Sequence, residues 1–182
     1  MSIHDGIRHR CDEGRLFPFT LGDGAPRRWL FMSKDVHELF TGPWKNQEWR
    51  NRCTDLSVDF EQFVSGQVVS VATNPRKAKR AYMSQLEKPY ERVWDIRSRN
   101  PSPGIRILGR FAEQNVFVAL SWYLRNRLGE YGSDEWNFAI GDSKTRWRQL
   151  FHPYDALGDD RKISKDNIHD YISSKVQLVG HP

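Results

Sequence analysis

The chain has 182 residues, a length that fits one domain able to form its own hydrophobic core. Aromatic residues make up 13% of the sequence, which excludes a disordered chain, and the presence of only two cysteines excludes a disulfide-stapled secreted scaffold. The formal net charge is +5, and we expect a basic, cytoplasmic protein because the first ten residues contain no apolar leader and no run approaches the ~18 apolar residues of a membrane span.

The first part of the chain predicts an irregular arm followed by one strand and two helices. Residues 1–26 contain four glycines and two prolines without a steady period, so we predict no regular structure there. Residues 28–32 predict a short strand, and Ser33 is suited to cap a short helix over 34–40. Apolar residues recur every three or four positions over 45–64, which predicts the clearest helix of the chain.

The middle of the chain predicts a basic helix and then three strands. Asn74-Pro75 is a good helix start, so we predict a second helix to about Glu87. Strands are predicted over 90–98, 105–111 and 116–123, with the last two forming a hairpin. Both faces of 116–123 are apolar, which predicts a central strand covered on both sides. The pattern after residue 129 is less regular.

Several short motifs resemble the RelE/ParE superfamily of toxins, including its HigB and related phage branches. These motifs are ERVWDIR at 91–97, GIRIL at 104–108 and VFVAL at 116–120, and the resemblance covers about residues 45–131. It implies an α+β fold in which two helices pack on one face of a small twisted antiparallel sheet. In the single domain 1–182, residues 1–44 would form an arm and first strand, and 132–182 a C-terminal extension. The chain is longer than usual members.

The resemblance implies a metal-independent endoribonuclease toxin that cleaves mRNA, usually on the ribosome, and is neutralised by a cognate antitoxin protein. In that reaction the 2′-hydroxyl of RNA attacks the neighbouring phosphate. Arginine suits the stabilisation of that phosphate, and a residue with a movable proton suits the proton transfers. By the resemblance, Arg106 and Arg127 would stabilise the phosphate, and Tyr131 would transfer a proton or stack on a base.

Each of these three residues also has a purely structural interpretation. Arg106 would form a cross-strand ion pair, Arg127 would be a solvated charge, and Tyr131 would be a half-buried core residue. The sequence feature that favours catalysis is the Arg127–Tyr131 spacing. The absence of a convincing general base near Arg106 favours a binding module instead.

Positive charge is concentrated in the middle third of the chain. Residues 76–127 contain 12 Lys or Arg and 4 Asp or Glu, and the segments before and after them are slightly acidic. Such a region attracts polyanions, of which nucleic acid is the commonest, although a solvated basic face without a partner is the alternative. The period of a strand places Arg106 and Arg110 on one face, together with Leu108. The predicted nucleic-acid-binding residues are Arg76, Lys77, Lys79, Arg80, Arg97, Arg110 and Arg125.

No metal or cofactor is expected. The acidic stretch 155–170, together with His152 and His169, contains ligand types, but their spacing matches no known metal motif, so a solvated acidic loop is the interpretation. The second functional hypothesis is a non-catalytic module that uses the same basic patch on RNA, DNA or an acidic protein. A gyrase inhibitor of the ParE kind is a third outcome.

Overall fold

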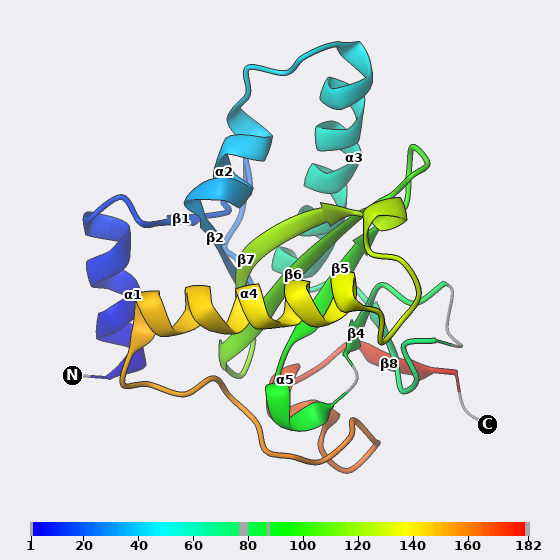
Figure 1. The fold of residues 1–182 in the computed structure, drawn as a ribbon. Coiled ribbons are helices and arrows are strands. Elements are labelled where there is room, and N and C mark those ends of the chain that lie inside the picture. The colour runs from blue at the N-terminus through cyan, green and yellow to red at the C-terminus, as the bar shows by residue number, and fades with distance from the viewer. Residues whose placement is uncertain (1, 77–79, 87, 181–182) are drawn as a thin grey trace.

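The computed structural model describes residues 2–76, 80–86 and 88–180 (Figure 1). Within these residues the strands form one mixed sheet of eight, in the order β1-β2-β7-β6-β5-β4-β3-β8. The helices are α1 (Ile3–Asp12), α2 (Lys34–Thr41), α3 (Gln47–Val64), α4 (Asp134–Phe151) and α5 (Ile168–Tyr171), with short 3-10 turns η1 (Pro89–Glu91) and η2 (Arg125–Arg127). The strands are β1 (Leu16–Pro18), β2 (Trp29–Ser33), β3 (Val69–Ala72), β4 (Met83–Gln85), β5 (Trp94–Ser98), β6 (Ile105–Glu113), β7 (Val116–Leu124) and β8 (Val176–Val179).

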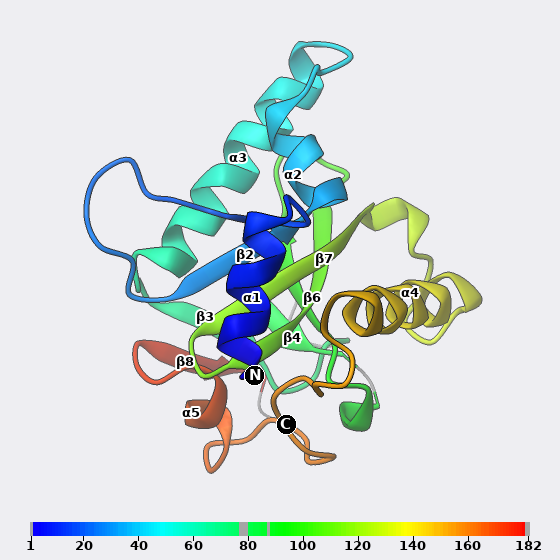
Figure 2. The same cartoon turned by 90° about the vertical axis from the view of Figure 1, so that its left-hand side faces the viewer.

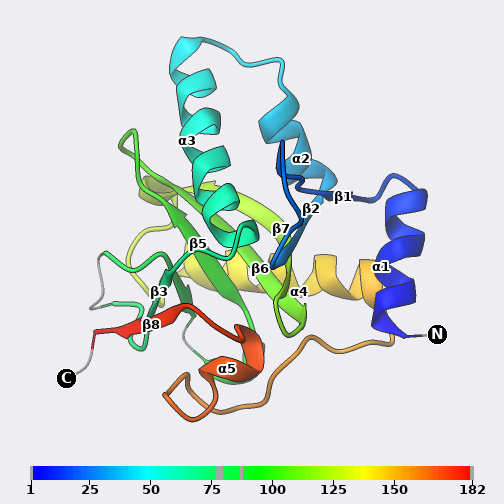
Figure 3. The same cartoon turned by 180° about the vertical axis from the view of Figure 1, so that it is seen from behind.

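Helices cover both faces of the sheet. Helix α4 crosses the face seen in Figure 1, and α3 lies on the opposite face, seen from behind in Figure 3. Figure 2 shows the same arrangement along the axis of α4, with the sheet between the two helices. The largest core cluster contains Phe60 and Phe63 of α3 packed with Phe117 of β7, and a second cluster contains Trp147 of α4 packed with Leu120 of β7. The molecule therefore has a core on each side of its sheet.

The strongest periodic patterns of the sequence form the elements predicted from them. Helix α3 is capped by the Asn46 side chain, which accepts a hydrogen bond from the Trp49 backbone N–H at 3.0 Å. Its apolar stripe is buried against the sheet, with Leu56 and Phe60 fully inaccessible. Ser33 caps α2 as expected. Strand β7 is central, because it lies between β2 and β6, and its two faces contribute to core clusters on opposite sides of the sheet.

The predicted fold class is wrong in size and in topology. We expected a small antiparallel sheet with two helices on one face, whereas the sheet within the described residues has eight strands and is mixed. Strand β2 pairs in parallel with β7, and β3 pairs in parallel with both β4 and β8. The β2–β7 pairing joins an N-terminal strand to the central hairpin, and the β3–β8 pairing places the C-terminal strand at the far edge of the sheet. Neither of these two pairings leaves a local signal in the sequence, because each joins segments that are far apart along the chain.

Two local predictions are also corrected. The segment predicted as a helix from Pro75 to Glu87 contains strand β4 instead, and its described residues 81–86 are all buried. An amphipathic surface helix leaves part of its circumference exposed, so six consecutive buried residues favour an internal strand. The arm predicted to be irregular contains α1, because Ser2 and Asp5 form a reciprocal capping box at its start.

Helices α3 and α4 have 18 residues each, and both carry charged side chains on the face away from the sheet. Within the described ranges, no helix has the length and the apolar character needed to cross a membrane. Helix α4 covers β6 and β7, and β6 carries Arg106 and Arg110, two of the arginines singled out in the sequence.

Candidate functional site

Four arginines and a tyrosine line one pocket of about 460 Å³ beside the start of α4. We call it the arginine pocket. It brings together five residues that the sequence singled out, from the turn after β3, from β5 and β6, and from the segment that joins β7 to α4. The lining residues are Pro75, Arg76, Arg97, Arg106, Arg125, Glu130 and Tyr131.

The pairing of β5 with β6 places two arginines directly opposite each other. Arg97 and Arg106 are cross-strand partners, an arrangement that is repulsive by itself. Asp95, two residues before Arg97 on the same face of β5, offsets this repulsion. The Arg97 Nε donates to both Asp95 carboxylate oxygens, at 3.0 and 3.1 Å, and the Arg106 Nε lies 3.4 Å from Asp95 Oδ2. Asp95 is completely buried.

The guanidinium group of Arg106 is the least engaged of the buried cations in the pocket. Its side chain is 11% exposed, and its buried Nε has no hydrogen-bond partner. Among the described residues, Asp95 is its one ion-pair partner, and no hydrogen bond from its terminal amino groups is found. A guanidinium group has five N–H donors, so Arg106 retains donors for an anion that enters the pocket.

Tyr131 closes the pocket from the loop that precedes α4. Its ring stacks on Trp136 with 4.5 Å between ring centroids, and its hydroxyl accepts a hydrogen bond from Arg97 Nη2 at 3.2 Å. Arg125 lies over the same tyrosine ring, 5.8 Å from its centroid, and donates to the backbone oxygen of Gly129 at 2.7 Å. The loop conformation thereby fixes both the phenol and the third arginine.

Burial and charge act in opposite directions on the ionisable groups of the pocket. Burial raises the pKa of Tyr131, Asp95 raises it further, and Arg97, Arg106 and Arg125 lower it in part, so the hydroxyl keeps its proton at neutral pH. Burial lowers the pKa of Arg106, and Asp95 opposes that change. Four guanidinium groups face two carboxylates, Asp95 behind the pocket and Glu130 in its wall, so the pocket has a net positive charge.

Several residues predicted to share this site lie elsewhere. Arg127 and Arg80 are exposed and do not line the pocket, and Lys77 and Lys79 lie outside the described residues. Arg110 lies on the same face of β6 as Arg106 but four residues further along, which is about 13 Å at the rise of a strand. It lines a different pocket.

Sequence reasoning missed two acidic members of the site. Asp95 precedes Arg97 by two residues in a predicted strand, and this spacing places both side chains on one face. Glu130, adjacent to Tyr131, provides a carboxylate in the wall of the pocket. It had no periodic signal, because it lies in the turn before α4.

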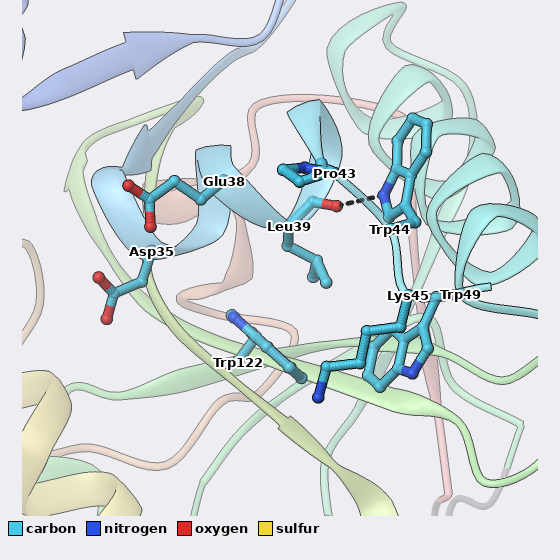
Figure 4. A pocket seen from close by; sticks show the side chains of 9 residues that line it. Asp35, Glu38, Leu39, Pro43, Trp44, Lys45, Trp49 and Trp122 are labelled. Atoms are coloured by element: carbon cyan, nitrogen blue, oxygen red, sulfur yellow. Dashed lines mark hydrogen bonds between the residues drawn. The ribbon is translucent and has the colours of Figure 1, made fainter.

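A separate pocket of about 450 Å³ has tryptophan walls (Figure 4). It lies between α2, the start of α3 and the end of β7, and Trp44, Trp49 and Trp122 surround Leu39. The Trp49 and Trp122 rings meet edge to face at 5.7 Å, and the Trp44 indole N–H donates to the Leu39 oxygen at 2.9 Å. Asp35 lies on its α2 side, so this pocket is poorly suited to an anion.

Within the described residues, no group of three or more His, Cys, Asp or Glu side chains is placed to hold a metal ion. Comparisons with models of protein families, with curated proteins and with solved structures found no match to this chain. The functional interpretation therefore rests on the geometry of the arginine pocket.

Proposed function

We propose that the protein binds single-stranded RNA with one phosphodiester in the arginine pocket and cleaves it there by metal-independent attack of the neighbouring 2′-hydroxyl. The observation that carries this proposal is the largely buried Arg106 guanidinium, whose terminal amino groups have no hydrogen-bond partner among the described residues. Such a group favours an anion as the partner that completes its hydrogen bonds.

The shape and charge of the pocket favour a phosphodiester over a small carboxylate. Arg106 and Arg125 approach from β6 and from η2, so two guanidinium groups can hold different oxygens of one phosphate. A recess of about 460 Å³ accommodates a phosphate with its flanking sugars. Unpaired RNA can present such a segment, because its backbone and bases are free to turn outward.

The residues that line the pocket match the requirements of the cleavage step. The 2′-oxygen forms a bond to phosphorus while the bond from phosphorus to the 5′-oxygen breaks, which leaves a 2′,3′-cyclic phosphate and a 5′-hydroxyl end. Glu130 accepts the proton of the 2′-hydroxyl, and Tyr131 donates its proton to the departing 5′-oxygen. Arg106 stabilises the charge that grows on the phosphate oxygens. Solvent then returns the proton from Glu130 to Tyr131.

An RNA cleavage assay with matched arginine variants tests this proposal. Dye-labelled single-stranded RNA is incubated with each protein in EDTA, and the fragments are analysed for cyclic phosphate ends. We expect Arg106→Gln to reduce the cleavage rate by about 10²- to 10³-fold, the usual effect of losing one stabilising donor. Tyr131→Phe removes the proposed acid and should also cost about 10²-fold or more.

Arg127 provides the control for these variants. Arg125 and Arg127 belong to the same 3-10 turn, but only Arg125 lines the pocket, so Arg125→Gln should slow cleavage and Arg127→Gln should not. Thermal melts of each variant confirm that it is folded. Wild-type cleavage rates in both Arg106→Gln and Tyr131→Phe would refute the proposed site. Cleavage of an all-deoxy strand of the same sequence, which has no 2′-hydroxyl, would refute the mechanism.

The second candidate is binding of RNA without cleavage. It is favoured by the Tyr131 hydroxyl, because a phenol whose pKa is raised by burial is a weak proton donor at neutral pH. In this case the protein should retain RNA on a filter in a salt-dependent manner that requires Arg106, while the RNA stays intact.

The toxin role implied by the resemblance remains a prediction. If the arginine pocket cleaves mRNA in cells, controlled expression of the protein should arrest growth, and Arg106→Gln should relieve the arrest. Co-expression of a cognate antitoxin would restore growth without any change in the protein. Unimpaired growth at an expression level confirmed by blotting would contradict the toxin role.

A further inference from the structure

A second basic pocket, of about 480 Å³, lies on the same side of the sheet as the arginine pocket, near the C-terminal end of α4. We call it the α4 pocket. Its walls come from η1 and the residue after it, from β6, from α4 and from the segment that follows α4. Its charged and aromatic lining includes Tyr90, Glu91, Arg92, Arg110, Lys144, Arg148 and Asp155.

Three guanidinium groups of the α4 pocket have no carboxylate partner among the described residues. Arg110 is 8% exposed, and its Nη2 and Nε donate to the backbone oxygens of Glu91 and Arg92 at 2.8 and 3.3 Å. The Nε of Arg92 is buried without a hydrogen-bond partner. Arg148 is exposed and makes no side-chain hydrogen bond or ion pair within the described chain. Neutral carbonyl groups orient these cations without cancelling their charge.

The charge balance of the α4 pocket favours an anion. Four cationic side chains line it, whereas only two carboxylates do, and one of these, Glu91, already forms an ion pair with Lys144. Burial lowers the pKa of Arg110 to about 10, which leaves this arginine cationic at neutral pH. Asp155 is therefore the remaining carboxylate against three arginines.

The two basic pockets lie in a row along one side of α4. A smaller pocket between them shares Tyr131 with the arginine pocket and is lined by Asn137 and Ile140 of α4. Lys144 and Arg148 of the α4 pocket continue this series at helical spacing. Arg106 of the arginine pocket and Arg110 of the α4 pocket are separated by about 13 Å along β6.

We propose that the α4 pocket binds a second phosphate of the RNA strand whose scissile phosphodiester lies in the arginine pocket. This inference rests on the proposed function and specifies its ligand as a single-stranded oligonucleotide that follows α4. A separation of about 13 Å corresponds to about four nucleotides at the 3.4 Å spacing of a stacked strand. An extended strand spans it with fewer.

An aromatic side chain beside the α4 pocket supports a nucleic acid over an acidic peptide. Tyr90 lines the pocket and is 54% exposed, so its ring is accessible to a ligand. Unpaired bases stack on such rings, and the combination of a cationic groove with an exposed aromatic ring is typical of proteins that bind single strands. A peptide of acidic residues would use the charges but not the ring.

Fluorescence anisotropy with single-stranded oligonucleotides of two lengths tests the second phosphate site. The probes are a dinucleotide and a hexanucleotide. Each has a 2′-deoxy sugar at every position but the last, so it cannot be cleaved. The proteins are the wild type, Arg148→Gln, Arg106→Gln and Arg127→Gln. We expect Arg148→Gln to weaken the hexanucleotide by about tenfold and to leave the dinucleotide unchanged. The dependence of affinity on salt should fall by about 0.7 in logarithmic slope, the loss of one phosphate contact to a single strand.

The two variants separate a failure of this inference from a failure of the proposed function. If Arg148→Gln binds the hexanucleotide like the wild type while Arg106→Gln does not, the second phosphate site is refuted and the proposed function stands. If Arg148→Gln weakens binding and Arg106→Gln does not, phosphate binding by the arginine pocket is refuted and phosphate binding by the α4 pocket is supported. Polyglutamate that competes as well as the hexanucleotide would overturn the assignment to nucleic acid. Arg127→Gln should match the wild type throughout.

Discussion

Replacing Asp95 by asparagine removes the negative charge that lies between two arginines beneath the arginine pocket. The Asp95 side chain is 0% exposed and the Arg97 side chain is 2% exposed, so neither charge is solvated in the folded protein. The Asp95→Asn side chain keeps the size of the original and one carbonyl oxygen that accepts from Arg97 Nε. The variant therefore tests the charge of Asp95 rather than its volume.

The expected loss of stability follows from the burial of this pair. Removing one partner of a buried ion pair leaves an uncompensated charge and costs about 3–5 kcal/mol. The hydrogen bond from Arg97 to the Tyr131 hydroxyl does not offset this cost, because a neutral phenol cannot replace a carboxylate. In a protein of this length each kcal/mol lowers Tm by about 2–4 °C, so Asp95→Asn should melt about 6–20 °C below the wild type.

Differential scanning calorimetry and urea unfolding measure this effect directly. Asp159→Asn is the matched control, because that carboxylate forms an exposed ion pair with Arg161 and its loss should leave Tm unchanged. Added inorganic phosphate should raise Tm more in Asp95→Asn than in the wild type, since the variant pocket carries one more net positive charge. A shift of less than about 2 °C corresponds to a loss of about 1 kcal/mol or less. If Asp95→Asn melts within that range of the wild type, the stabilising role of the buried ion pair is refuted.

Two further predictions concern the strands that carry the site. Burial, together with Asp142, raises the pKa of Tyr123 to about 12 in the folded protein, whereas the tyrosine of the unfolded chain releases its proton at about pH 10. In urea unfolding, the wild type should therefore lose stability relative to Tyr123→Phe as the pH rises from about 10 to about 12. Equal losses of stability in both proteins would contradict a raised pKa. Gly109→Ala would place a Cβ against the Val118 carbonyl oxygen at the β-bulge of the β6–β7 hairpin and should cost about 1–3 kcal/mol. Gly141→Ala, with open space around its Cβ, should not destabilise the protein, and comparable losses in both alanine variants would remove the steric explanation.

Local patterns predicted those parts of the fold whose burial repeats along the chain. The apolar stripe of α3 and the hairpin of β6 and β7 follow from spacings of three to four residues and of two residues, because each spacing reports which side faces a core. The same spacing explains why Arg106 and Arg110 share a face of β6. The charge excess of residues 76–127 also pointed to the segment that lines both basic pockets.

Periodicity failed where a segment is buried on all sides. Residues 81–86 contain Tyr82, Met83 and Leu86 at spacings that suit a helix, yet the segment lies inside the sheet as β4 and its flanks. A fully buried strand loses the alternation that distinguishes it from a helix. Arg76 and Arg80 therefore lie in turns rather than in the first turns of a helix.

The amino-acid sequence alone was sufficient to identify a folded α+β chain, its main amphipathic helix, its central hairpin and the region of positive charge. The tertiary structure decided the size of the sheet, the two parallel pairings that incorporate β2 and β8, and the division of the arginines between two pockets. The physical reason is that burial imposes a short repeat on the sequence, whereas the choice of a distant strand partner imposes none. Asp95 and Arg106 meet because β5 pairs with β6, the next strand along the chain, whereas Tyr131 joins them because the segment after β7 folds back onto these strands.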